Sequence, residues 1–73
     1  MKIGLYEHYK GKHYEVLGLS HHSETMEELV VYKALYDTDF GFDSLWVRPR
    51  AMFEEVIEIN GQKRARFKYL GGA

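Results

Sequence analysis

An Asn-Gly pair at residues 60 and 61 constrains the fold of this 73-residue chain more than any other local feature. The pair lies between two segments of alternating apolar and polar residues, in "MFEEVIEINGQKRARFKYL". Asn-Gly in that setting is the strongest short-range signal for a β-hairpin. Register follows the face that is buried, so we expect a three-residue loop with Gly61 in the left-handed conformation. That loop places the apolar side chains together: Phe53, Ile57, Ile59, Ala65, Phe67 and Tyr69.

Two earlier segments also have the composition of strands. Residues 12–20, "KHYEVLGLS", have a strand-like alternation around Tyr14 and Val16. Residues 28–36, "ELVVYKALY", are rich in β-branched and aromatic side chains, which favour strands. Apolar residues fall on both faces of this second segment, as in a central strand or a small barrel. A helix over residues 26–36 is the competing interpretation, but the Val-Val-Tyr run favours the strand.

The remaining segments are short. Residues 1–11 are expected to be a lead-in segment that a turn at Gly11 closes. Residues 37–43, "DTDFGFD", read as an acidic loop of turn-forming residues. The following "SLWVRP" at 44–49 predicts a short strand that ends at Pro49. Proline also suits the first position of a helix, so "RPRAMF" is compatible with one helical turn.

Several short strands joined by turns, with almost no helix, predict an all-β fold with at most one short helical turn. The SH3-like β-barrel is the commonest architecture of this size, and we expect it here. A chain of 73 residues has room for one domain. The sequence therefore predicts that residues 1–73 form a single small β-barrel domain.

Composition limits both the compartment and the chemistry. The chain has no cysteine, which excludes disulfides, thiolate metal sites and a cysteine nucleophile and fits a reducing cytoplasm. No apolar run has the length of a signal peptide or approaches the roughly 20 residues of a membrane helix. We expect a cytoplasmic protein without a membrane partner. Ten Lys and Arg against eleven Asp and Glu give a net charge of −1, which provides no global field for nucleic acid and leaves a homodimer open.

Two adjacent histidines precede a short polar motif. Neighbouring side chains in a strand point to opposite faces, so His21 and His22 are poorly placed to share a metal that needs three or four converging ligands. We expect no metal and no other cofactor. The motif of His22, Ser23, Glu24 and Thr25 has the composition of a turn that bonds its own backbone, although it is also a candidate for one end of a ligand groove. No oxyanion or acid context accompanies Ser23, so the sequence favours a protein that is not an enzyme.

The segment "LWVRP" is the strongest candidate for a binding surface. Trp46 beside Arg48 on a short strand can stack on a ligand and bind an anion. The rings of Tyr32, Tyr36, Phe40 and Phe42 are expected to line the same groove. The plainer interpretation is that Trp46 belongs to the core. The sequence thus favours a binding module for a peptide, a small anion or a partner protein.

The run "QKRARFK" at 62–68 supports an alternative function. Its cations Arg64, Arg66 and Lys68 flank an aromatic residue, a combination typical of nucleic-acid binding. On the expected register, these cations share the outer face with Glu54 and Glu58, which dilutes the positive patch. Nucleic acid is therefore the second hypothesis.

Three stretches in order resemble a bacterial family, domain of unknown function 1653: "YEHYKGKHYEVLGLSHHSETMEELVVYKALY", "LWVRPRAMFEEV" and "RFKYL". The resemblance covers nearly all of residues 6–70. The chain departs from the family pattern at Arg50-Ala51, where Leu-Glu is frequent, and at Ala65, where proline is frequent. The resemblance implies a small, mostly β domain and supplies no activity. The positions that match its motifs are His8, Tyr9, Lys10, Gly11, His22, Ser23, Glu24, Thr25, Tyr32, Trp46, Arg48 and Pro49.

Overall fold

β-Strands make up most of residues 1–72, the part of the chain that the computed structural model describes. A single helical turn interrupts them, so the all-β fold class predicted above is confirmed, helical turn included. The elements are β1 (Gly4–His8), β2 (His13–His21), β3 (Glu28–Ala34), β4 (Leu45–Pro49), α1 (Arg50–Phe53), β5 (Val56–Ile59), β6 (Gln62–Ala65) and β7 (Phe67–Gly71).

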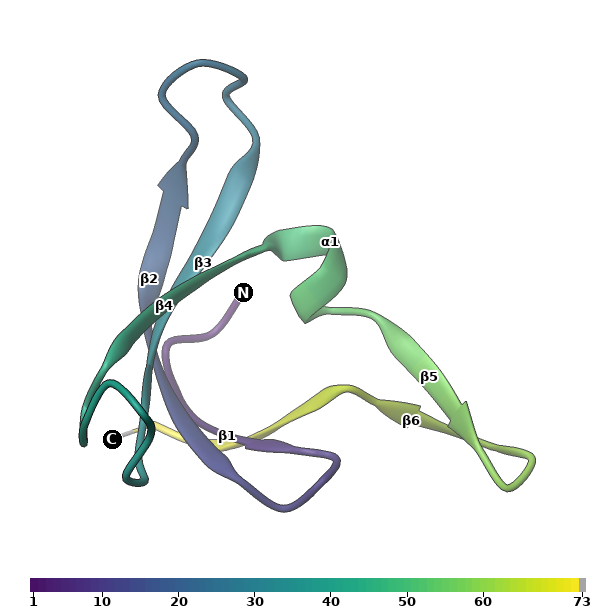
Figure 1. The fold of residues 1–73 in the computed structure, drawn as a ribbon. Helices are drawn as coiled ribbons and strands as arrows, with labels where there is room; N and C mark the ends of the chain where they lie inside the picture. The colour runs from purple at the N-terminus through teal and green to yellow at the C-terminus, as the bar shows by residue number, and fades with distance from the viewer. Residues whose placement is uncertain (73) are drawn as a thin grey trace.

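Five of the strands form one antiparallel sheet in the order β4-β3-β2-β1-β7. The sheet is not closed into the expected SH3-like barrel, because the outer strands β4 and β7 do not pair with each other in the described residues. After β4 the chain turns at Pro49 into α1, which lies over the open side of the sheet and precedes a two-stranded arm, β5-β6 (Figure 1). The single turn of α1 carries Phe53 into the core.

The first strand was missed at the sequence level. Instead of a lead-in segment, β1 pairs with β2 on one side and with β7 on the other. Its first residue, Gly4, has a φ of 134°, and a Cβ at this position would collide with the backbone oxygen of Gly71. Glycine is rare inside strands, which conceals the strand in the sequence. The predicted turn at Gly11 is confirmed by the hydrogen bond of 2.7 Å from its N–H to the carbonyl of His8.

The pairing of β2, β3 and β4 decides which side chains share a face. Tyr32 stands opposite Val16 on one side and Trp46 on the other. Val30 stands opposite Arg48 in the same way. Directly opposed residues point to the same face of a sheet, so Trp46 and Arg48 both lie on the core side of β4. The competing helix over residues 26–36 does not form.

Aromatic rings from distant segments build the core. Phe53 of α1 stacks on Phe67 of β7 with centroids 4.1 Å apart, and Tyr6 meets the Phe53 ring edge-on at 5.4 Å. Large rings let a short chain remove enough apolar area from water to fold. The buried hydrophobic residues are Tyr6, Val16, Val30, Tyr32, Ala34, Phe53 and Phe67.

The β5-β6 hairpin has a register different from the expected one. Ile59 pairs with Gln62, which leaves a two-residue loop of Asn60 and Gly61 with φ values of 51° and 78°. Positive φ at both positions is the type I′ turn that Asn-Gly favours. The odd-length loop was therefore wrong. The prediction assumed that the hairpin buries one face. The side chains of the arm are mostly exposed instead, and Val56, for example, keeps 62% of its surface accessible.

Candidate functional site

Trp46 lies at the surface and not in the buried core. It keeps 36% of its surface exposed, because β4 is an edge strand of the sheet. The indole lines an open pocket of about 370 Å³ with Tyr36, Phe40 and the acidic loop residues Asp37 and Asp39. We refer to this hollow as the Trp46 pocket.

A chain of hydrogen bonds holds the two most exposed rings of the Trp46 pocket. The indole N–H of Trp46 donates to Ser44 Oγ at 3.0 Å, and Ser44 Oγ lies 3.0 Å from Thr38 Oγ1. The Thr38 hydroxyl donates to the carbonyl of Gly41 at 3.0 Å and accepts the N–H of Phe40 at 3.0 Å. As a result the Phe40 and Trp46 rings meet at 71° with centroids 5.5 Å apart. These bonds thus hold the indole of Trp46 and the backbone of Phe40, which carry two walls of the pocket.

Tyr36 forms the third aromatic wall and is held from behind. Its hydroxyl lies 2.7 Å from that of Tyr14, and the two rings meet edge-on. Burial, followed by the hydrogen bond to Tyr36, raises the pKa of Tyr14 well above its usual range. Lys12 Nζ lies 4.7 Å from the centroid of the Tyr36 ring, so this ring already attracts one cation.

Arg48 does not join Trp46 in a common groove, although the two share a face of β4. Its Nε donates to the hydroxyl of Tyr32 at 3.4 Å, and its guanidinium carbon lies 5.5 Å from the centroid of Phe67. Arg48 therefore reaches from β4 across the open side of the sheet to β7. This placement gives Arg48 a role in covering the core and removes it from the wall of the Trp46 pocket.

The His-Ser-Glu-Thr motif forms the exposed turn between β2 and β3. His22 Nδ1 accepts the backbone N–H groups of Glu24 at 3.1 Å and Thr25 at 3.3 Å. Thr25 Oγ1 accepts the N–H of Glu27 at 3.2 Å. The motif thus satisfies its own backbone, and Ser23 lies within the same turn. The turn adjoins the Glu28 end of β3, whereas the Trp46 pocket adjoins the opposite end.

The three cations of the C-terminal run are separated by a break between β6 and β7. Arg66 lies at the break and pairs with Glu55 at 3.3 Å, while Arg64 belongs to β6 and Lys68 to β7. The predicted pairing of these cations with Glu54 and Glu58 is replaced by another: Glu58 stands opposite Lys63. The continuous basic strand expected from the sequence is therefore absent.

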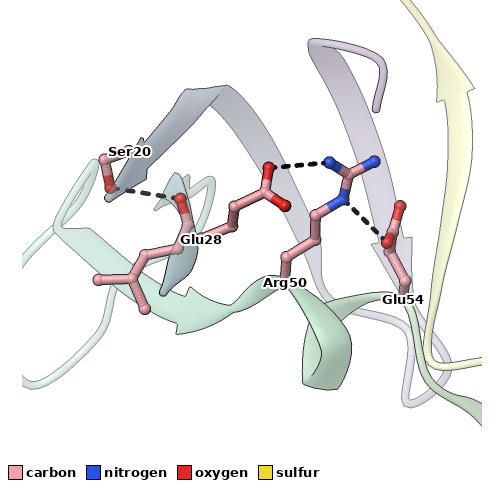
Figure 2. A network of polar contacts seen from close by, with 5 residues as sticks. Ser20, Glu28, Arg50 and Glu54 are labelled. Carbon is pink, nitrogen blue, oxygen red and sulfur yellow. Dashed lines mark hydrogen bonds and ion pairs between the residues drawn. The ribbon is translucent and has the colours of Figure 1, made fainter. Parts of the chain in front are cut away.

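Arg50 belongs to a structural network at the start of α1 (Figure 2). Its Nη1 lies 3.1 Å from Glu28 Oε2, and its Nε lies 3.0 Å from Glu54 Oε1. The hydrogen bond to Glu54, followed by that to Glu28, raises the pKa of the Arg50 guanidinium. The contacts tie the helical turn to Glu28, the first residue of β3. We regard this network as support for α1 and not as a ligand site.

The sequence pointed to the aromatic residues of the Trp46 pocket but not to the side chains that hold them. Thr38 and Ser44 were not singled out, although short hydroxyl residues beside Gly41 in a loop are a recognisable turn signal. No group of three or more metal-ligating side chains gathers within residues 1–72. Among the helices described there, none is long and apolar enough to span a bilayer.

Comparison with known proteins agrees with the resemblance noted in the sequence. The profile of a family described as "Protein of unknown function (DUF1653)" matches residues 4–69. The crystal structure of a protein of the same family from Bordetella bronchiseptica superimposes with a TM-score of 0.89 at 36% identity, over 100% of this chain and 91% of that one. No curated protein matches the chain. The chain therefore belongs to the DUF1653 family of proteins of unknown function.

Proposed function

We propose that this chain is a non-enzymatic binding module whose Trp46 pocket holds a cationic side chain of a partner peptide or protein. The observation that carries the proposal is the composition of the pocket wall. Three aromatic residues, Tyr36, Phe40 and Trp46, stand beside the carboxylates of Asp37 and Asp39. Aromatic faces attract cations through their quadrupole, and recognition of ammonium groups by aromatic cages relies on this attraction.

The charge of the pocket favours a cation over a small anion. The anion hypothesis depended on Arg48, which is engaged with Tyr32 and Phe67 instead. The lining residues of the pocket include two acidic side chains and no basic one. Electrostatic complementarity chiefly sets specificity and the association rate, so a Lys or Arg side chain is the matching ligand.

The edge strand beside the pocket supports a peptide as the carrier of that cation. Leu45 and Val47 of β4 are 66% and 60% exposed, and they flank Trp46 along the edge of the sheet. An extended segment that pairs with an exposed sheet edge gains affinity from its backbone and specificity from pockets for alternate side chains. The Trp46 pocket is placed to receive one such side chain.

The test exploits the single tryptophan of the chain as a fluorescent reporter. A blocked, alternating Val-Thr peptide with one central lysine is titrated against the chain, beside the same peptide with trimethyl-lysine or with neutral norleucine. We expect the two cationic peptides to bind about tenfold more tightly than the norleucine peptide, because cation–π attraction contributes about 1–2 kcal/mol. Equal affinities for all three peptides, or none for any, would refute the proposal.

Matched variants assign the effect to the pocket. Asp37→Asn with Asp39→Asn should weaken binding of the cationic peptides and leave the norleucine peptide unchanged. Asp43→Asn is the charge control, because Asp43 lies in the same loop outside the pocket and asparagine tolerates its φ of 58°. Phe40→Leu should remove the preference for a cation, whereas Phe42→Leu, another exposed ring of the loop, should preserve it.

A further inference from the structure

A second open hollow lies where the end of β1 meets the break between β6 and β7. It has a volume of about 370 Å³, and its walls include Glu7, His8, Tyr9, Arg64 and Lys68. None of its lining residues belongs to the Trp46 pocket. Ligand sites for small molecules typically enclose about 300–1,000 Å³, so this hollow lies at the lower end of that range. We refer to it as the Tyr9 hollow.

The backbone at Arg66 creates the Tyr9 hollow. The N–H of Arg66 donates to the carbonyl of Glu55 at 3.0 Å, and its carbonyl accepts the N–H of Tyr9 at 2.9 Å. These bonds bend the chain between β6 and β7 and hold it against the end of β1. As a result Arg64 and Lys68, which come from separate strands, line one hollow, while the side chain of Arg66 pairs with Glu55.

The two cations of the Tyr9 hollow are free of strong internal partners. Neither Arg64 nor Lys68 takes part in an ion pair within residues 1–72. Glu7 is the acidic residue among the lining side chains, and it lies 3.6 Å from His13 Nε2. Two cations against one carboxylate leave the hollow with a positive charge, in a chain whose net charge is −1.

His8 provides a second sign of positive potential at this place. Burial lowers the pKa of His8, and the charges of Arg48, Arg66 and Lys10 lower it further. Its Nδ1 accepts the backbone N–H of Lys10 at 3.2 Å, which is compatible with a neutral imidazole. The positive charges among these causes, unlike the burial, also favour an anion in the Tyr9 hollow.

We propose that the Tyr9 hollow binds a nucleotide of single-stranded nucleic acid, with Arg64 and Lys68 on the phosphate and the Tyr9 ring against the base. Tyr9 lines the hollow and packs on the His8 ring with centroids 4.5 Å apart, which gives the phenol a supported position. Lys10 Nζ lies 5.7 Å from the centroid of the same ring and adds a third cation nearby. Cations beside an aromatic ring are the standard elements of single-strand recognition, since every base has a face that stacks. This combination favours nucleic acid over an acidic peptide or a lipid headgroup, which have no base to stack.

The experiment is a chemical-shift titration of the isotopically labelled chain at low and moderate salt. The probes are a short oligothymidylate, thymidine monophosphate and inorganic phosphate. We expect shifts of residues 9–11, 64, 65 and 68, with affinity in the order oligothymidylate, nucleotide, phosphate. Arg64→Gln with Lys68→Gln should weaken the binding of oligothymidylate by at least tenfold. Each phosphate contact contributes about 0.7 to the salt slope of a single strand, so the double variant, which removes both cations from one phosphate, should lower the slope by about 0.7.

Two further variants separate the roles within the Tyr9 hollow. Lys33→Gln with Lys63→Gln removes the same charge outside the hollow and should change the affinity less than twofold. Tyr9→Leu should weaken the binding of the oligothymidylate and of the nucleotide but leave the affinity for inorganic phosphate unchanged. Equal affinity for phosphate and oligothymidylate, shifts centred elsewhere, or equal losses in the two double variants would overturn the proposal. Retained amide spectra of each variant confirm that a loss of binding is not a loss of fold.

Discussion

The five-stranded sheet and the β5-β6 arm are both antiparallel, but different physical causes determine their structures. In the sheet, Val16 and Val30 are fully buried, and Tyr32, which stands opposite Val16, is nearly so. In the arm every residue of β6 is exposed, and its register follows from the turn at Asn60 and Gly61. Alternation of apolar residues predicts the buried face and the register of a strand only where that face packs on a core. Where no core exists, the turn residues determine the register.

The largest expected difference between the two regions comes from removing a ring of the core. Phe53→Ala should lower the free energy of unfolding by about 3–5 kcal/mol, since it leaves a cavity against Phe67 and Tyr6. Urea denaturation monitored by far-UV circular dichroism measures the loss. Val56→Ala in the exposed start of the arm is the control and should change stability by less than about 0.5 kcal/mol. Comparable losses in both variants would mean that the arm is part of the same core.

The next effect concerns the close approach of β1 and β7 in the sheet. Gly4→Ala should cost about 1–3 kcal/mol, because alanine is strained at a φ of 134° and its Cβ meets the carbonyl of Gly71. The measurement is a thermal or urea unfolding curve. Gly11→Ala shares the positive φ but has no atom within 4 Å of the added Cβ, so the difference between the variants reports the collision. A larger loss at Gly11 than at Gly4 would contradict this account of the β1–β7 contact.

The turn of the arm should show a local effect without a global one. Replacing Asn60 and Gly61 with two alanines removes the residues that accept positive φ and should raise the free energy of the hairpin by about 1–2 kcal/mol. Native-state hydrogen exchange should then speed up in β5 and β6 and stay unchanged in β2 and β3. A matching loss of protection in β2 would show that the arm and the sheet open as one unit.

The smallest effect is a pH dependence at the place where sheet and arm meet. Burial and nearby cations lower the folded-state pKa of His8 below 6.5, so the unfolded chain binds the proton more readily. His8 should therefore stabilise the fold above pH 6.5, and this contribution should decline as pH falls from 6.5 toward the folded-state value. Urea titrations at several pH values should show a shallower decline in that window for His8→Gln. His21→Gln, an exposed control at the far end of β2, should retain the decline of the parent chain.

The elements that the sequence predicted are those with strong local signals, and the features that it missed depend on tertiary contacts. The strands over β2, β3 and β4 and the helical turn after Pro49 were predicted, because β-branched runs and proline carry strong local signals. The whole of β1 was missed. Its first residue, Gly4, approaches Gly71 closely, and no local pattern records that contact. For the site, Trp46 and Tyr36 were predicted to lie together and do so. The sequence could not show that Arg48 and Trp46 have different surroundings, because strand alternation places both on one face. Only the tertiary structure shows that Arg48 lies against Phe67.

The point at which the arm joins the sheet has a consequence for the evolution of chains of this kind. The arm leaves after Glu55 and returns at Arg66, and these two residues are joined by a backbone hydrogen bond of 3.0 Å and an ion pair of 3.3 Å. A segment whose ends meet in this way can lengthen or shorten at small entropic cost without moving the rest of the domain. Relatives should therefore differ in length here more readily than in the sheet. Because the arm supplies Arg64, a lineage that trims it would keep the fold and the Trp46 pocket but lose one wall of the Tyr9 hollow.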